Sequence, residues 1–169
     1  MKDFKEALKI LEKSKEFNAW KRKNPETYLS YGFFVVEDAD SDWKIGYYHK
    51  KDDRMTSFNV GEKITIEPEE EIFQKEKKKV EKLDMEKVKL GLAEAVAIAN
   101  QVQQEEYATE MPRKIIAILQ TLDKKQVWNV TFLTQSFNTL NFKIKSENGR
   151  VVEKKLQPLF QFDEGQGAS

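Results

Sequence analysis

Residues 127–132 read Val127-Trp128-Asn129-Val130-Thr131-Phe132, and no other stretch of the chain indicates the fold so clearly. Large apolar side chains alternate with polar ones, which is the period of a β-strand that buries one face. The same alternation begins on the tryptophan of Trp43-Lys44-Ile45-Gly46-Tyr47, 85 residues earlier. The two stretches predict equivalent strands, one in each half of the chain.

The sequence around Trp128 predicts one helix followed by about four strands. Residues 85–107 place an apolar stripe at helical spacing, which consists of Val88, Leu92, Ala95, Val96, Ala99 and Val102. Apolar runs of strand length follow at 115–122, 127–134, 139–145 and 151–156. The last two are joined by Glu147-Asn148-Gly149, and Asn-Gly is a strong signal for a hairpin turn.

The sequence around Trp43 predicts the same order of elements. Residues 3–23 have a helical apolar stripe of Phe4, Ala7, Leu8 and Leu11, which ends at Asn24-Pro25. Ile10, Phe17 and Trp20 fall beside this stripe, so the helix either rolls across a wide sheet or has a second apolar face. Strands are expected at 28–36, 43–49, 55–60 and 64–66.

The two halves match at a constant separation of 85 residues. Phe34 matches Leu119, Leu11 matches Val96 and Met55 matches Leu140, and two inserted residues bring Ile72-Phe73 onto Leu159-Phe160. We therefore expect an α+β fold of two tandem helix-plus-antiparallel-sheet units. The first unit covers residues 1–74 and the second covers 85–162, with a charged connector at 75–84 and a flexible tail at 163–169.

The composition excludes several classes of protein. With 29 basic and 29 acidic residues the chain is neutral, and neither half has the basic excess that phosphate binding needs, so no nucleic-acid partner is expected. The absence of cysteine excludes disulfides, thiolate zinc sites and cysteine nucleophiles. No apolar run approaches the ~20 residues of a membrane-spanning helix. We expect a soluble, cytoplasmic protein, or a secreted one if a leader precedes this sequence.

Few residues could carry out catalysis. His49 is the sole histidine, and the sequence identifies neither an orienting acid nor a nucleophile for it. Glu67 and the glutamates at 69–71 share one exposed environment, which does not separate an acid from a base. Phosphate-binding glycine loops and nucleophile elbows are absent. We expect a protein that is not an enzyme and has no cofactor.

A metal site is not expected either. Asp38, Asp40 and Asp42 have the alternate spacing of calcium ligands. The positions that an EF-hand loop needs as glycine and glutamate are Trp43 and His49. An acidic turn whose side chains cap backbone amides is the better explanation.

The first half has more aromatic residues than one helix can cover. Phe33 with Phe34 and Tyr47 with Tyr48 place rings on both faces of their strands. Packing within the core or between the units is one explanation, and a binding surface is the other. The candidate binding residues are Phe34 and Tyr48 first, with Tyr31, Phe33, Tyr47 and Trp43.

Three stretches of the second half carry a family resemblance: Leu92-Ala93-Glu94-Ala95-Val96-Ala97-Ile98-Ala99, the Trp128 strand and Asn148-Gly149-Arg150-Val151-Val152. Through them residues 88–156 resemble the PepSY domain, a helix-plus-sheet module of peptidase propeptides and cell-envelope proteins. The first half resembles it more faintly, through Ala7-Leu8-Lys9-Ile10-Leu11, the Trp43 strand and Gly61-Glu62-Lys63-Ile64. The resemblance implies a fold and a theme of peptidase inhibition or modulation, without catalytic residues.

Two functions fit these observations. The first is a binding or regulatory module that contacts a protein or peptide partner through a sheet face or an exposed edge strand, and that could also form a homodimer. The alternative is a carrier that holds a small apolar ligand between helix and sheet, among Tyr31, Phe33, Tyr47 and Trp43. A cavity lined by these aromatics would favour the carrier, and a flat exposed aromatic face would favour the binding module.

Overall fold

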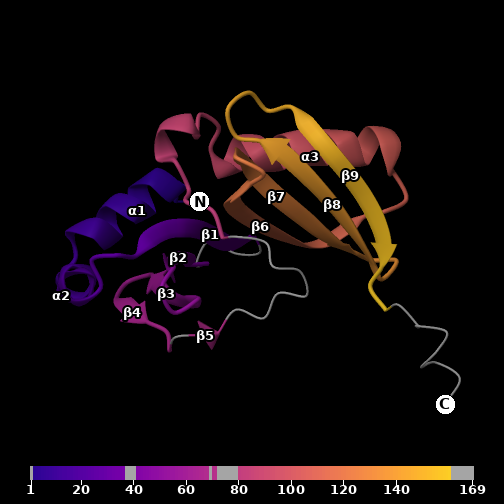
Figure 1. Cartoon of the computed structure of the whole chain (residues 1–169). Helices are drawn as coiled ribbons and strands as arrows, with labels where there is room; N and C mark the ends of the chain where they lie inside the picture. Colours follow the sequence, from indigo (N-terminus) through magenta and orange to yellow (C-terminus); the bar gives the residue numbers. More distant parts are fainter. Residues whose placement is uncertain (1, 37–40, 69, 72–79, 161–169) are drawn as a thin grey trace, which may run out of the picture.

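The helices lie on one face of a single antiparallel sheet (Figure 1), so the α+β class predicted from the sequence is confirmed. The computed structural model describes residues 2–36, 41–68, 70–71 and 80–160. The helices are α1 (Phe4–Lys13), α2 (Lys15–Lys23), the short 3-10 helix η1 (Met85–Lys87) and α3 (Leu92–Glu106). The strands are β1 (Tyr28–Val36), β2 (Trp43–His49), β3 (Arg54–Val60), β4 (Ile64–Ile66), β5 (Glu70–Glu71), β6 (Pro112–Leu122), β7 (Lys125–Thr134), β8 (Asn138–Lys145) and β9 (Val151–Pro158).

One continuous sheet runs through both halves of the chain. Its strand order is β4-β3-β2-β1-β6-β7-β8-β9, and the short β5 also pairs with β3. The junction is the antiparallel pair of β1 and β6, at whose centre Phe33 lies opposite Ile118. A backbone ladder therefore joins the two groups of strands that the sequence predicted separately.

The core lies between this sheet and the helices, and two tryptophans are at its centre. Trp43 of β2 and Trp128 of β7 are 1% and 0% exposed, with ring centroids 6.2 Å apart. Trp43 Nε1 donates a hydrogen bond to the carbonyl of Lys2 (2.8 Å), and Trp128 Nε1 donates one to the carbonyl of Leu90 (3.0 Å). Both acceptors lie just ahead of a helix, so each indole attaches the start of a helix to the sheet.

Small residues of β1 and β6 make room for large ones on the helix-covered face. A Cβ atom on Gly32 would stand 2.3 Å from Phe4 Cε2, so only glycine fits beneath the first residue of α1. Gly32 lies opposite Leu119 in β6, and Ala117 of β6 lies opposite Phe34. Large side chains thus meet small ones across the junction, which allows close packing.

The single helix predicted for residues 3–23 is wrong, because the chain breaks into α1 and α2 at Ser14. Ser14 is extended (φ −73°, ψ 150°), and its Oγ accepts a hydrogen bond from the backbone N–H of Phe17 (3.1 Å). The change of direction buries Phe17 against Tyr47 and Phe58, at ring centroid distances of 5.0 and 5.5 Å. It explains why Phe17 falls beside the apolar stripe of α1.

The helix predicted for residues 85–107 is also shorter than expected. Residues Met85–Lys87 form the 3-10 turn η1, Val88 is extended (φ −89°, ψ 103°), and α3 begins only at Leu92. The backbone N–H groups of Lys89 and Leu90 both donate to the carbonyl of Ser146 (2.9 and 2.7 Å), which holds this segment on the sheet. Val88 is buried as predicted from its spacing, but it lies ahead of the helix.

The match of Met55 with Leu140 is a further correction. Leu140 is fully buried beneath the helices, whereas Met55 is half-buried on the other face of the sheet. Several predictions concern segments outside the described residues: Asp38 and Asp40 of the acidic turn, the match through Ile72-Phe73, most of the connector and the tail at 163–169.

Candidate functional site

An apolar strip runs along β1 and β6 on the face of the sheet away from the helices. It consists of Tyr31, Phe33 and Val35 of β1 with Ile116 and Ile118 of β6, and we call these five residues the seam. Side chains alternate between the faces of a strand, so each seam residue lies between neighbours that point to the core. All five are half-buried. We call this face the open face, since the described helices all lie on the other one (Figure 1).

Polar side chains flank the seam on both sides. The row through its centre reads, from β3 to β8, Asn59, Lys44, Phe33, Ile118, Asn129 and Lys143. The next row reads, from β1 to β9, Val35, Ile116, Thr131, Asn141 and Lys155. In these two rows the apolar part of the open face is thus two strands wide, with amide, hydroxyl and ammonium groups beside it.

Tyr31 lies flat at one end of the seam because its neighbour in β2 is a glycine. A Cβ atom on Gly46 would stand 1.9 Å from Tyr31 Cε1, so the ring occupies the space of the missing side chain. The Tyr31 hydroxyl then reaches β3, where it is hydrogen-bonded to Ser57 Oγ (2.6 Å). The Tyr31 side chain therefore reaches from β1 across β2 to β3.

Hydrogen bonds fix the polar groups on either side. Lys44 forms an ion pair with Glu67 (2.6 Å), and this bond lowers the pKa of the Glu67 carboxyl. Asn59 donates to the same carboxylate (2.9 Å). Across the seam, the Asn141 amide donates to Asn129 Oδ1 and to Thr131 Oγ1. The flanks are ordered before any partner arrives.

The open face carries mostly positive charge, although the whole chain is neutral. By strand alternation, six lysines and one glutamate point to it: Lys44, Lys114, Lys125, Lys143, Lys145, Lys155 and Glu153. Glu153 forms an ion pair with Lys143, and Glu67 pairs with Lys44. The described strand positions of this face therefore carry more lysines than carboxylates, a local excess that composition alone does not show.

A hollow of ≈ 820 Å³ lies at the β6–β7 hairpin. Its apolar walls are Leu122, Val127 and Val152. Charged groups of both signs also line it, namely Glu81, Asp123, Glu153, Lys124, Lys125 and Lys143.

The structure divides the six candidate binding residues between the two faces. Phe34, Trp43 and Tyr47 are 3%, 1% and 4% exposed beneath the helices, so their assignment to a binding surface is wrong. Tyr31 and Phe33 belong to the seam. The four aromatics named for a ligand carrier therefore do not line one cavity, because Tyr31 and Phe33 lie on the opposite face from Trp43 and Tyr47.

Tyr48 points to the open face but is covered. It is 7% exposed, its ring packs against Tyr28 at a centroid distance of 5.6 Å, and its hydroxyl donates to Asp53 Oδ1. Burial, together with this hydrogen bond, raises the pKa of Tyr48 to about 12. Tyr48 therefore supports the sheet beside the seam and offers little surface to a partner.

The sequence analysis missed Ile116 and Ile118, which supply one side of the seam. The run at 115–118 was expected only as part of an ordinary strand. The sequence signal for a second apolar face was the unbroken run Ile115-Ile116-Ala117-Ile118. In an antiparallel strand with one solvent-exposed face, apolar residues would alternate with polar ones.

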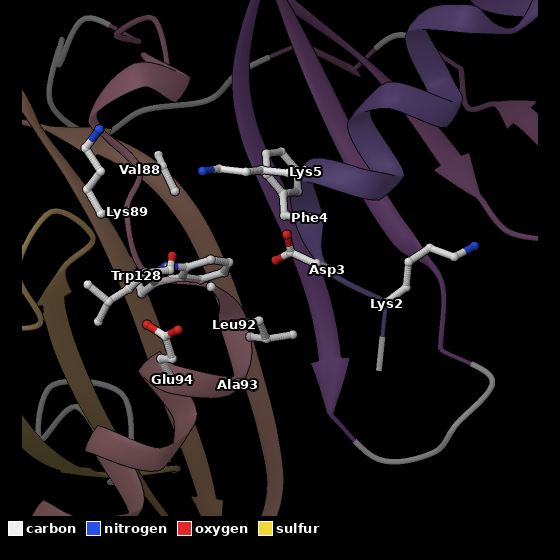
Figure 2. Close-up of a pocket in the computed structure, with 12 residues that line it drawn as sticks. Lys2, Asp3, Phe4, Lys5, Val88, Lys89, Leu92, Ala93, Glu94 and Trp128 are labelled. Atoms are coloured by element: carbon white, nitrogen blue, oxygen red, sulfur yellow. The ribbon is translucent and has the colours of Figure 1, made fainter.

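A second hollow, of ≈ 300 Å³, lies between the starts of α1 and α3 (Figure 2). Residues 2–5 and 88–94 line it, together with Trp128. Asp3 lies between the two helix starts, and a Cβ atom on Gly91, the N-cap of α3, would stand 3.2 Å from Asp3 Oδ1. The carboxylate thus already places a negative charge at the positive end of α3.

The other polar candidates have structural partners. His49 is buried at the end of β2, where its Nε2 is hydrogen-bonded to Thr56 Oγ1 (2.7 Å) and its ring packs against Trp20. Among the residues that the structure describes, no group of three His, Asp or Glu side chains could hold a metal ion. None of the helices in the described ranges is long and apolar enough to cross a membrane.

Comparison with known proteins gives a structural likeness. No family model matches the chain, and no curated protein is similar to it in sequence. The crystal structure of a protein from Clostridium difficile 630, provisionally described as a lipoprotein, superposes with a TM-score of 0.56 over 84% of this chain and 90% of that one. The two share a fold. At 13% sequence identity the likeness extends to the fold alone.

Proposed function

We propose that the chain is a non-catalytic binding module that holds a protein or peptide partner against the seam. The observation that carries the proposal is the half-buried apolar strip of Tyr31, Phe33, Val35, Ile116 and Ile118, on the face opposite the described helices. The strip lies among ordered polar groups, which is the arrangement of an apolar contact area with a polar rim. Covering it would remove apolar surface from water, at about 25 cal/mol per Å².

We further propose that the sheet consists of two tandem units related by the β1–β6 junction. Three observations support this. Trp43 and Trp128 each lie one strand out from the junction, and both indoles bond to the residue two before a helix. Residues 85 apart lie opposite each other at its centre, as Phe33 and Ile118. The separation between equivalent residues is not constant along the chain. It is 88 between Phe4 and Leu92, the first residues of α1 and α3. It is 84 between Phe58, which pairs with Ile45, and Phe142, which pairs with Val130.

The PepSY resemblance gives the proposal a specific form, in which the partner is a peptidase whose activity the module modulates. The cytoplasmic location expected from the sequence remains one option. The provisional description of the Clostridium difficile protein as a lipoprotein favours the other option, a chain that works outside the cytoplasm. A peptidase or its propeptide would be available to the module there.

Cross-linking and capture from a lysate of the source cells test the proposal. Phe33→Thr/Ile118→Thr removes the centre of the seam and keeps strand-forming residues. Ile10→Gln is the matched control, since Ile10 is a 43% exposed apolar residue on α1. We expect the seam variant to lose the captured protein and the control to retain it. Equal capture by both variants, with unchanged circular dichroism, would overturn the proposal.

A further inference from the structure

We propose that the segment of the partner that lies on the seam is an acidic, amphipathic α-helix running parallel to β1 and β6. This inference rests on the proposed function, and it adds the conformation and the charge of the partner. It follows from the width of the seam, from the chemistry of the open face and from the sign of its charge.

The width of the seam suits one helix. Its flanking side chains, Lys44 and Asn129, stand on β2 and β7, which are three strand spacings or about 14 Å apart. An α-helix with its side chains is about 10–12 Å across. From Tyr31 to Val35 the seam is about 14 Å long, which matches roughly nine residues of helix.

The chemistry of the open face favours a helix over an extended peptide. The backbone groups of β1 are used by β2 and β6 on its two sides, so the seam offers only side chains. A segment that lies on an apolar strip must then satisfy its own backbone N–H and C=O groups. A helix does this internally, whereas an extended peptide needs a sheet edge.

The charge of the open face favours acidic flanks on this helix. Lys125 and Lys155 are exposed, and Lys145 is half-buried, beside the ion pairs of Lys44 and Lys143. A second copy of the chain would bring the same lysines to this face, and like charges would oppose that pairing.

A displayed library of random peptides, each about 16 residues long, tests the inference even while the native partner is unidentified. The full chain is the bait, and Phe33→Thr/Ile118→Thr is the counter-bait. We expect the peptides that need the seam to be acidic, to carry apolar residues at i, i+3 or i+4 and i+7, and to gain helical circular dichroism when bound. Lys125→Glu/Lys155→Glu should weaken them about tenfold, while Lys9→Glu/Lys13→Glu, the same charge change on α1, should not.

Three results would overturn the inference: seam-dependent peptides that are basic or alternate with period two, seam-dependent binding of single-stranded oligothymidylate, or no seam-dependent peptide at all. If capture of a native partner still depends on Phe33 and Ile118 in any of these cases, the inference fails and the proposed function stands. If neither capture nor any peptide depends on the seam, both fail.

Discussion

The ring of Tyr31 occupies the space above Gly46, at a position where a Cβ atom would be 1.9 Å from the ring. This contact joins β1 to β2 on the open face and holds the Tyr31 hydroxyl against Ser57. Gly46→Ala must displace the ring, and we expect it to lower the free energy of unfolding by about 1–3 kcal/mol. Urea denaturation measures this loss. In a Tyr31→Ala background the same substitution should cost less, and an equal cost in both backgrounds would contradict the contact.

Phe33 and Phe34 are neighbours in sequence on opposite faces of β1. Phe34 is 3% exposed in the core, so Phe34→Ala should cost about 3–5 kcal/mol of stability. Phe33 is half-buried, and Phe33→Ala should cost only about 1–2 kcal/mol. Thermal and urea unfolding of the two variants test this order. Equal losses would mean that the seam is ordinary core.

Trp43→Ala and Trp128→Ala should each cost about 3–5 kcal/mol, because both rings are fully buried. Phenylalanine at either position keeps much of the packing and removes the indole hydrogen bond to the start of a helix. We expect these two conservative variants to be intermediate in stability. A denaturation midpoint unchanged by Trp128→Ala would show that the indole is not part of the core.

Tyr48 makes the stability depend on alkaline pH. The pKa of Tyr48 is about 12 in the folded chain because of burial and its bond to Asp53, against the ordinary value of about 10 when unfolded. Between these two pKa values the unfolded state has released the proton and the folded state still holds it. The stabilising effect is therefore complete below pH ~10 and is lost as the pH rises towards about 12. Urea denaturation across this range should show the loss, and Tyr48→Phe should reduce the slope. An identical slope in the variant would assign the loss to other groups.

Phe137 has a left-handed backbone, with φ of 59°, in the turn between β7 and β8, and its side chain is 59% exposed. This conformation costs about 1–2 kcal/mol for a residue with a Cβ atom. We expect Phe137→Gly to raise the free energy of unfolding by about 1 kcal/mol. Phe137→Ala is the control, since it removes the ring and keeps the strain. A gain in alanine as large as in glycine would show that the ring itself is unfavourable.

Much of the fold could be predicted because local patterns determine it. The alternation from Trp128 to Phe132 fixes which face of β7 is buried, and the structure places Trp128, Val130 and Phe132 in the core. The break at Ser14 was missed because it involves hydrogen bonds of one polar side chain, whose Oγ donates to the carbonyl of Leu11 and accepts from the backbone N–H of Phe17. These bonds leave the apolar pattern unchanged. The displaced aromatics Phe17 and Trp20 were the sign of it.

The candidate site was harder to predict because it depends on a pairing between distant strands. Tyr31 and Phe33 could be named from their own strand, but their role required Ile116 and Ile118, which β1–β6 pairing brings alongside. No local sequence pattern indicates which distant strand pairs with β1. Without that pairing, the sequence does not show which of Phe33 and Phe34 points to the core. Phe34 was preferred for the binding surface, and it is the one that the core buries.

The order of the strands also determines how the chain can assemble. From β1 to β4 and from β6 to β9, each strand pairs with its successor along the chain, through connections of a few residues. Such hairpins form rapidly because their loops are short. The β1–β6 ladder, in contrast, closes a loop that contains β2 to β5, η1 and α3. The late step in folding is thus expected to be the closure of this ladder, and the surface assigned here to the partner does not exist until that step is complete.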